Sequence, residues 1–510
     1  MPRKNMDEYE PLLIKDSGAK RTSKLPNSSL LMAMFAAGIG GTFQYGYNIS
    51  VINAPTMSVQ SFINQTWQDR YQTAISEKLV TLLWSVIVSI FTLGGLMGAL
   101  LGGTLSVKMG RKGTLLTNNI FALSGALLMG LSYPTASFEL LIIGRLLTGI
   151  QAGVSICVQP LYLGEIAPTQ YRGLMGMGTS IFITVGILAG QIMGLREVLG
   201  QEQYWPILLS TTCIPAIVQL MILPFFPESP RYLLIDRGDD EGCKKALKQL
   251  HGASRWDGEK EDIEKERNNL LGFKAKKPWE LFTDRSLRLQ LLTVMLLNSA
   301  QQLNGINAIY FYAGYVFDEA GIAADKIPYV TVGTGACECL TALTCGLLVE
   351  SLGRRVLITG GYVLMSICCI LFTLTLTFTD ASPVFPYLSM ACIFAFILSF
   401  GLGPGGVTNI LTTELFTQTT RPAAYTITGT VNWTSFFLIS LVFPFIVLGL
   451  QQYCFLVFMV ICTAMALYIF FVVPETKNKS FLEIQNHFKS SNRKGQSADS
   501  SAATLLASSL

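Results

Sequence analysis

The chain has 510 residues, of which 50% are hydrophobic and 14% are charged, and its mean hydropathy is +0.45. A soluble domain carries about 25% charged residues, so this composition excludes an ordinary soluble protein and favours a protein that lies in the bilayer. The net charge of +4 gives no indication of a nucleic-acid partner. Because the two histidines and eleven cysteines lack metal or disulfide spacing, we expect no metal, no cofactor and no enzyme activity.

Residues 1–28 are polar and of mixed charge, which predicts a cytosolic tail rather than a signal peptide. The sequence EYEPLL at residues 8–13 fits an acidic dileucine signal. In such a signal Leu12 and Leu13 would bind sorting adaptors and give an endosomal pool. So short a pattern also arises by chance in a solvated tail, and both interpretations stay open.

About twelve apolar stretches follow the tail, each close to the roughly 20 residues that cross a bilayer as a helix. They cover 30–52, 79–105, 113–133, 138–163, 173–199 and 205–226 in the first half, and 288–316, 327–350, 355–379, 384–412, 421–449 and 453–473 in the second. The prediction is an all-α membrane protein with an N-terminal six-helix half over 29–227 and a C-terminal six-helix half over 288–474.

Short charged signatures recur in the chain at a separation of roughly 245 positions, which is about half its length. Gly110-Arg111-Lys112 returns as Gly353-Arg354-Arg355, and Pro227-Glu228-Ser229 returns as Pro474-Glu475-Thr476. Two copies of one unit explain this repeat. Membrane proteins built in that way usually move small solutes.

The basic residues of the connectors set the orientation. The connectors between spans 2 and 3 and between spans 8 and 9 hold Lys108, Arg111, Lys112, Arg354 and Arg355. The positive-inside rule then places both termini, including the tail over 475–510, in the cytosol. The sequon at Asn64 falls in a loop that this orientation makes extracellular, so we expect a glycoprotein of the plasma membrane.

The stretch 228–287 is the one large polar insertion, and it joins the two halves on the cytosolic side. Segments 239–250 and 258–271 have the charge spacing of amphipathic helices. They are either a tether or a latch between the halves, and both interpretations stay open.

Span 7 holds the densest group of polar side chains within the membrane. Its amides are Asn298, Gln301, Gln302, Asn304 and Asn307, and Gly305 interrupts them. Polar groups in a span cost energy unless they line water, pair or bind something. Amides donate and accept hydrogen bonds, which suits a ligand rich in hydroxyl groups. A cavity is favoured here over simple interhelical hydrogen bonding.

Other polar or irregular positions lie in the neighbouring spans. The run GLGPGG at 401–406 in span 10 cannot hold a regular helix, so it either faces a cavity or makes a packing kink. Further polar points are Gln44, Asn48, Gln191, Asn432 and Trp433. Glu338, in span 8, must face water, pair or stay protonated, because a bare carboxylate costs about 2.5–3.5 kcal/mol there.

Together these motifs resemble the sugar porter family of the major facilitator superfamily, and most of all the animal facilitative glucose/fructose transporters. The matching pieces include Gly110-Arg111-Lys112, the sequence PLYLGE at 160–165, the sequence PESPR at 227–231, the sequence QQL at 301–303, Asn432-Trp433 and the sequence PETK at 474–477. The resemblance implies a 12-helix bundle around a central hexose site, worked by alternating access. It also implies a chain that acts as a monomer.

The resemblance assigns roles residue by residue. The implied substrate contacts are Tyr45, Gln191, Gln301, Gln302, Asn307, Phe400, Asn409, Asn432 and Trp433. The implied extracellular gate is Phe311 with Tyr312. The implied cytosolic lock comprises Arg111, Glu165, Arg172, Glu350, Arg354, Arg355, Glu414 and Arg421.

Three departures from the family pattern bear on the substrate. Glucose-selective members carry tryptophan, asparagine and serine at the positions of Asn409, Glu338 and Asn304. The sequences FQYGYN at 43–48 and NAI at 307–309 resemble the fructose-handling branch instead. That branch includes members reported for urate, so fructose, glucose and urate all remain candidates.

Asn48 indicates how transport is driven. Proton-coupled relatives carry an aspartate at its position in span 1, and this span holds no acidic residue. Passive uniport is therefore the prediction. The alternatives are proton symport through Glu338 as a titratable site and a sugar sensor that does not transport. An ion channel lacks support because no ring of acids lines a span.

Overall fold

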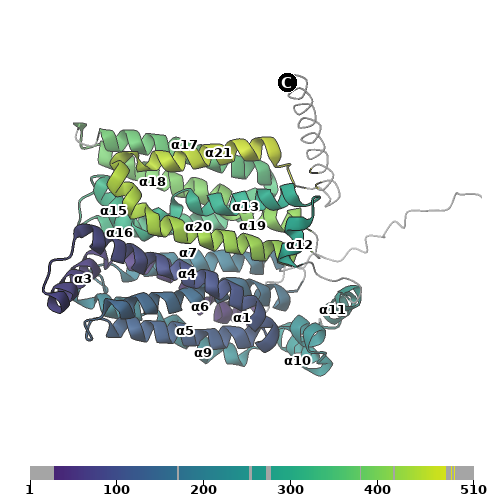
Figure 1. Cartoon of the computed structure of the whole chain (residues 1–510). Coiled ribbons are helices and arrows are strands. Elements are labelled where there is room, and N and C mark those ends of the chain that lie inside the picture. Colours follow the sequence, from purple (N-terminus) through teal and green to yellow (C-terminus); the bar gives the residue numbers. More distant parts are fainter. Residues whose placement is uncertain are drawn as a thin grey trace, which may run out of the picture.

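A computed structural model of the chain describes residues 28–168, 172–251, 256–270, 277–378, 381–416 and 420–477, with residues 484 and 488 (Figure 1). The described residues form helices and connectors, without a strand among them. The predicted sorting motif at Leu12 and Leu13 lies outside the described residues. The all-α class predicted from the sequence is confirmed.

The helices of the first half occupy the six predicted spans and one loop. They are α1 (Ser28–Ile39), α2 (Thr42–Ser50), the short turn η1 (Val51–Asn53), the loop helix α3 (Thr56–Tyr71), α4 (Glu77–Met109), α5 (Arg111–Leu131), α6 (Phe138–Ile166), α7 (Arg172–Met193), α8 (Trp205–Ser210) and α9 (Cys213–Ile222). The polar insertion forms α10 (Asp240–His251), α11 (Trp256–Leu270) and α12 (Pro278–Thr283). Its first two helices match the predicted segments.

The second half repeats this series. Its elements are α13 (Arg288–Leu303), α14 (Ile306–Phe311), α15 (Ala313–Glu319), α16 (Ile327–Leu352), α17 (Arg354–Thr377), α18 (Phe385–Phe400), η7 (Gly401–Gly405), α19 (Gly406–Leu415), α20 (Arg421–Leu450) and α21 (Cys454–Val472). Across the described residues, seven helical stretches are long and apolar enough to cross a membrane, and one of these covers both α20 and α21. Spans 1 and 7 fall short of that measure because a break divides each of them.

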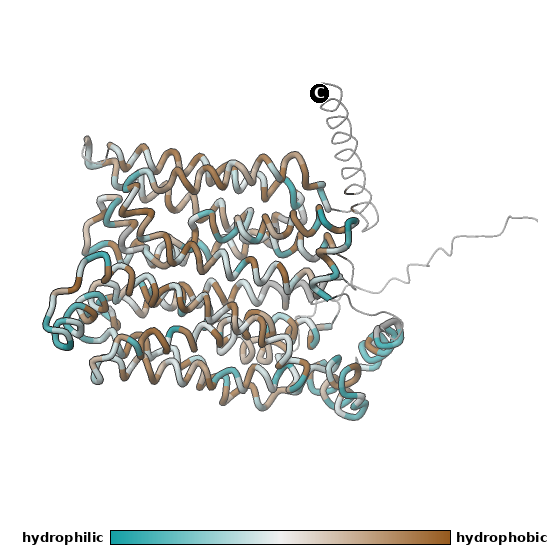
Figure 2. The backbone as a smooth tube through the Cα atoms, viewed as in Figure 1, coloured by the Kyte–Doolittle hydropathy of each residue, from teal (hydrophilic) through white to brown (hydrophobic). Residues whose placement is uncertain are grey.

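The long helices run side by side, with polar segments gathered at the ends of the bundle (Figures 1 and 2). The loop helix α3 lies at one end, and α10 and α11 lie at the other (Figure 1). The two halves meet mainly where α4 packs on α20 and where α7 packs on α16. The centre of the bundle is therefore bounded by helices that are far apart in the sequence.

Two irregular segments interrupt the spans of the second half. Gly305 has a left-handed backbone (φ +98°) between α13 and α14, and a Cβ there would lie 2.6 Å from the Phe458 ring. The run 401–405 forms a π-helical turn with Pro404 inside it. The irregularity predicted for this run is present, although the chain stays helical through it.

Close contact between α4 and α6 depends on glycine. A Cβ at Gly149 would lie 2.0 Å from the backbone oxygen of Phe91, so α6 lies directly on the backbone of α4. Gly164, on the same helix, has no heavy atom within 4 Å of the equivalent point.

Replacing Gly149 with alanine is therefore expected to push α4 and α6 apart and lower stability by about 1–3 kcal/mol. Thermal unfolding of the detergent-solubilised protein measures this loss. The control Gly164→Ala is expected to melt at or above the wild-type temperature, because alanine favours the helix. Equal melting temperatures for Gly149→Ala and Gly164→Ala would contradict the close packing described for Gly149.

Candidate functional site

Three amides from three helices meet at the centre of the bundle. The Gln302 amide nitrogen donates to the Asn432 side-chain oxygen at 2.7 Å, and the Asn307 amide donates to the Gln302 oxygen. Gln302 lies in the last turn of α13, Asn307 lies in the first turn of α14 after the Gly305 break, and Asn432 lies on α20. We call these three residues the amide cluster. Its groups are neutral donors and acceptors, which is the chemistry that recognises hydroxyl groups.

An aromatic wall borders the amide cluster. Trp433 follows Asn432 on α20 and is 3% exposed. Its indole meets the Tyr45 ring edge-on, with the centroids 5.7 Å apart and the planes at 79°. Tyr45 belongs to α2 in the first half, so this contact joins the halves. Gly95 of α4 leaves room for the indole, because a Cβ there would lie 2.1 Å from it.

Two of the other three amides predicted to line the cavity bond to the backbone of their own segment. The Asn298 amide donates to the Val294 carbonyl of its own helix at 2.8 Å. The Asn304 oxygen accepts from the Ile306 N–H at 3.0 Å and so caps α14. Sequence periodicity alone did not separate these two from Gln302 and Asn307, since all of them lie in one polar stretch.

The remaining predicted contacts lie around the amide cluster. Gln301 donates to the Pro404 and Gly405 carbonyls of η7 at 3.4 and 3.5 Å. Gln191 donates to the Thr334 hydroxyl across the halves at 3.2 Å, and its side-chain oxygen is buried without a hydrogen-bond partner. Phe400 ends α18 and is half-buried, whereas Asn409 is exposed on α19.

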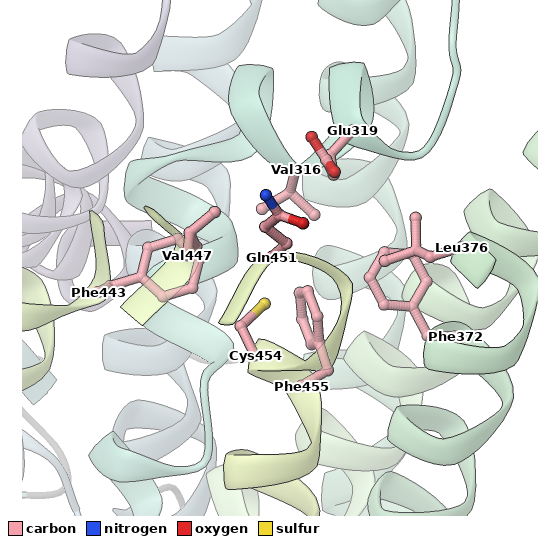
Figure 3. Close-up of a pocket in the computed structure, with 9 residues that line it drawn as sticks. All are labelled: Val316, Glu319, Phe372, Leu376, Phe443, Val447, Gln451, Cys454 and Phe455. Atoms are coloured by element: carbon pink, nitrogen blue, oxygen red, sulfur yellow. The ribbon is translucent and has the colours of Figure 1, made fainter. Parts of the chain in front are cut away.

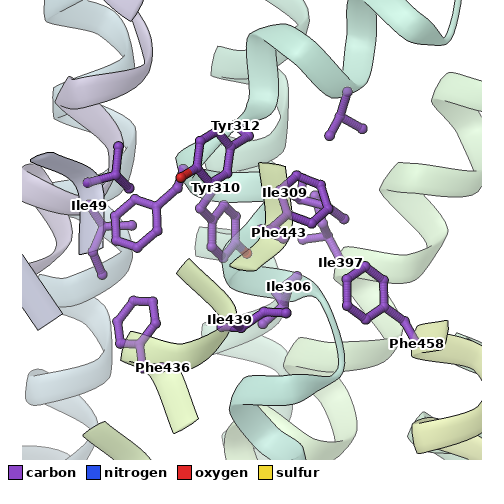
Figure 4. Packing of buried hydrophobic residues seen from close by; sticks show 14 of the residues in the cluster. Ile49, Ile306, Ile309, Tyr310, Tyr312, Ile397, Phe436, Ile439, Phe443 and Phe458 are labelled. Carbon is purple, nitrogen blue, oxygen red and sulfur yellow. The ribbon is translucent and has the colours of Figure 1, made fainter. Parts of the chain in front are cut away.

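The two residues predicted to form the extracellular gate are both buried. Phe311 is fully buried and stacks on Phe436 with ring centroids 5.3 Å apart. The Tyr312 hydroxyl donates to the Ser440 carbonyl at 2.9 Å. Figure 4 shows the surrounding cluster, in which Ile49 of α2 lies beside residues of α14 and α20. Both halves thus contribute to this cluster.

Sequence reasoning missed two residues that join the halves next to the predicted gate. The Asn53 amide of η1 donates to the Tyr310 carbonyl of α14, and these residues are 257 positions apart. Neither residue carried a signal in the sequence, because the interaction is made with a backbone carbonyl and depends wholly on how the halves pack.

At the end of the first half that adjoins the polar insertion, Arg111 has two acidic partners. Its guanidinium lies 2.9 Å from the Glu165 carboxylate and 2.7 Å from that of Asp236. The Ser229 hydroxyl also donates to Glu165, and the Tyr232 ring lies under the guanidinium at 4.8 Å. The predicted Arg111/Glu165 pair is present, and Asp236 from the insertion extends it.

The second half has the equivalent pair. The Arg354 guanidinium lies 3.1 Å from the Glu414 carboxylate. The Arg355 guanidinium donates to the Phe470 carbonyl. Arg172, Glu350 and Arg421, the other predicted members of the lock, have side chains that lie outside the described part of the chain.

The repeated PES and PET motifs cap helices. Glu228 accepts hydrogen bonds from the backbone N–H groups of Arg111 and Lys112 at 3.0 and 2.9 Å, where α5 begins. Glu475 does the same for Arg354 and Arg355, both at 3.0 Å, where α17 begins. Burial opposes the charge of Glu475, but its backbone donors outweigh burial and hold its pKa below the usual range. This capping role came only from the structure.

Two more predicted positions are placed by the structure. Glu338 lies on α16, with one carboxyl oxygen buried and without a hydrogen-bond partner. Asn64 is exposed on α3, at the end of the bundle opposite α10 and α11 (Figure 1).

A small hollow lies apart from the amide cluster, among α15, α17, α20 and α21 (Figure 3). Its wall includes Phe372, Phe443 and Phe455, with Glu319 and Gln451 as polar members. Because its lining is almost wholly apolar, it lacks the donors and acceptors that a hexose needs. The amide cluster is the better candidate site.

Comparison with known proteins finds a matching family and similar relatives. A family described as "Sugar (and other) transporter" matches residues 33–488. Solute carrier family 2, facilitated glucose transporter member 11 of Homo sapiens is 50% identical over 455 residues, which cover 89% of this chain and 92% of that protein. Member 9 of Mus musculus and member 5 of Ovis aries are each 46% identical, over 93% and 91% of this chain and over 88% and 93% of those proteins.

Solved structures show the fold. The inward-open form of the xylose transporter XylE from E. coli matches with a TM-score of 0.74 and 20% identity, over 90% of this chain and 99% of that chain. The major facilitator superfamily proton:xylose symporter XylE bound to 6-bromo-6-deoxy-D-glucose matches with a TM-score of 0.71 and 22% identity, over 91% and 100% of the two chains. The predicted twelve-helix major facilitator fold is thereby confirmed.

Proposed function

Because this chain belongs to the sugar (and other) transporter family, we propose that it carries hexoses passively across a membrane by alternating access. The amide cluster is the observation that supports this most directly. It sets Gln302, Asn307 and Asn432 beside the Trp433 indole, between the two halves. Amides for hydroxyl groups and an aromatic face for the ring are what a neutral sugar requires.

The absence of fixed charge in the amide cluster suits a carrier that must release its substrate. Millimolar affinity needs about −4 kcal/mol. A few neutral hydrogen bonds of about 1 kcal/mol each, with ring stacking, supply that amount. A charged site would bind more tightly and release more slowly.

The surroundings of Arg145 favour uniport over proton symport. This buried arginine of α6 donates to the Asn48 carbonyl at 2.9 Å, and it lies over the Phe91 ring at 4.6 Å. Among the residues that the structure describes, no acid pairs with it. Proton-coupled relatives carry an aspartate at the position of Asn48. The described part of span 1 therefore has no acidic side chain beside Arg145 that could accept a proton.

In this proposal the halves over 29–227 and 288–474 rock about the amide cluster. Phe311 and Tyr312 close the extracellular side, and the arginine–glutamate pairs brace the cytosolic side. The tails over 1–28 and 475–510 and the linker over 228–287 lie in the cytosol. The carrier acts as a monomer in the plasma membrane, glycosylated at Asn64, with sorting adaptors at Leu12 and Leu13 supplying an endosomal pool.

Transport by the purified protein in proteoliposomes tests the mode. We expect labelled D-fructose or D-glucose to equilibrate across the membrane without accumulating, even when a proton gradient is imposed. Counterflow is expected as well, because a carrier exchanges bound sugar. Accumulation that Glu338→Gln abolishes would establish proton symport instead, and sugar binding without counterflow would establish a sensor.

The same vesicles identify the substrate. The family relatives are named as facilitated glucose transporters, whereas the sequences at 43–48 and 307–309 resemble the fructose-handling branch. Competition of labelled fructose uptake by glucose and by urate ranks the three candidates. The most effective competitor at equal concentration is the preferred substrate.

A further inference from the structure

The break in span 1, at Gly40 and Gly41, leaves backbone groups without helical partners. α1 ends at Ile39 and α2 begins at Thr42, and the Gly41 backbone between them lies outside the helical region (φ −99°, ψ −112°). Such a break frees the last carbonyl groups of one helix and the first N–H groups of the next. Buried backbone groups need hydrogen-bond partners, so the groups that pair with them also fix the direction of α2.

Two glutamines of α6 pair with the freed groups next to α2. The Gln159 side-chain oxygen accepts from the Thr42 N–H at 2.6 Å, across 117 positions. The Gln151 amide nitrogen donates to the Gly40 carbonyl at 2.8 Å, across 111 positions. Both side chains are fully buried, out of reach of bulk water. A Cβ at Gly41 would lie 2.1 Å from the Gln159 oxygen, so α6 rests directly on the break and fixes the start of α2.

A third glutamine holds the end of α1. The Gln219 amide nitrogen of α9 donates to the Ala36 and Ala37 carbonyls at 3.0 and 2.9 Å. Its oxygen accepts from the Asn119 amide of α5 at 2.8 Å, which fixes the orientation of the glutamine. The two ends of the break are thus held by helices of the first half other than span 1 itself.

The corresponding break in span 7 is held differently. Asn304 caps α14 from within the same span, and Gly305 packs against the Phe458 ring of α21. The start of α14 is therefore secured by its own segment, whereas the start of α2 depends on hydrogen bonds from α6. Side chains of α6 are in this way able to influence whatever α2 carries.

α2 carries Tyr45 to the border of the amide cluster. Tyr45 follows Thr42 by less than one helical turn, so it moves with the start of the helix. Its ring meets the Trp433 indole with centroids 5.7 Å apart, and it lies 6.4 Å from the Phe91 ring. A rotation of α2 would move the Tyr45 ring away from the indole. The hydrogen bonds that start α2 therefore set the position of this ring.

We propose that Gln159 and Gln151 are positioning residues for substrate binding, because they fix the start of α2 and thereby hold the Tyr45 ring against Trp433. This inference rests on the proposed carrier function, in which the two rings border the sugar site. Gln159 and Gln151 act through the backbone of residues 40–42, without contact with the sugar.

Uptake of labelled hexose by proteoliposomes separates this role from a general structural one. Gln159→Met nearly keeps the volume of the side chain and removes the acceptor for the Thr42 N–H. We expect the half-saturation concentration to rise about fivefold, because a displaced aromatic contact weakens binding, while the maximal rate stays within about twofold of wild type. Gln151→Met, which removes the donor to the Gly40 carbonyl, is expected to act in the same direction.

A double variant tests whether Gln159 acts through Tyr45. Tyr45→Ala removes the ring, and adding Gln159→Met to it is expected to raise the half-saturation concentration no further. The control Gln290→Met makes the same replacement at a fully buried glutamine of α13, whose amide atoms have no hydrogen-bond partner among the described residues. This control is expected to leave the half-saturation concentration unchanged.

Two results overturn the proposal. One is an unchanged half-saturation concentration in folded Gln159→Met and Gln151→Met carriers. The other is a double variant in which the effects of Gln159→Met and Tyr45→Ala multiply, which would make the two residues independent. Absence of counterflow in the wild-type protein refutes the carrier function itself, and so the failure of that function is distinguished from the failure of this inference.

Discussion

Replacing Gln302 with alanine is expected to reduce hexose uptake about 50-fold while the protein still reaches the cell surface. Gln302 donates to Asn432 and accepts from Asn307, so its loss leaves the buried Asn307 amide and the half-buried Asn432 amide unpaired, and it removes a donor and an acceptor that we propose bind sugar. Unpaired buried groups cost about 1–3 kcal/mol, and 1.4 kcal/mol is a factor of ten in rate or affinity. Asn307→Ala is expected to act in the same direction.

Uptake of labelled hexose, normalised to surface protein, measures this effect. The control is Gln68→Ala, which removes the same amide from an exposed position on α3 and is expected to leave uptake within about twofold of wild type. Normal uptake by both Gln302→Ala and Asn307→Ala would remove the amide cluster from the transport path.

Replacing Arg111 with alanine is expected to give the second large loss. The side chains of Arg111 and Glu165 are each 11% exposed, and removal of the arginine breaks this ion pair, which leaves Glu165 with the Ser229 hydroxyl and the charge of Arg231. Breaking a buried pair in this way costs about 3–5 kcal/mol, and the partial exposure of this pair puts the loss near the lower value. We expect the maximal uptake rate to fall at least about tenfold, with a lower melting temperature in detergent.

Two further variants separate the ion pair from other effects. Adding Glu165→Gln to Arg111→Ala is expected to recover part of the melting temperature, because it removes the unpaired charge. Arg70→Ala breaks an exposed arginine–glutamate pair on the opposite face, with side chains 34% and 48% exposed, and is expected to cost less than about 1 kcal/mol. Equal losses of melting temperature and uptake rate for Arg111→Ala and Arg70→Ala would contradict the proposal that the Arg111–Glu165 pair stabilises the cytosolic side.

The sequence alone determined the architecture of this protein. A transmembrane helix is recognised from its own residues, because each span must satisfy the bilayer locally. The twelve spans and the two insertion helices therefore followed from hydropathy and charge spacing. The motif Gly110-Arg111-Lys112 recurs as Gly353-Arg354-Arg355, and this repeat predicted the division into two halves. It could do so because each copy is recognised from three consecutive residues.

Tertiary structure alone decided which polar groups work together. Asn298 and Gln302 lie on one helix, yet only Gln302 meets Asn432, because that contact depends on how α20 packs beside α13. Asp236 joins Arg111 across 125 positions, and Asn53 joins Tyr310 across 257. A sequence records which residues are able to form hydrogen bonds and ion pairs, but partners this far apart are chosen by helix packing in three dimensions.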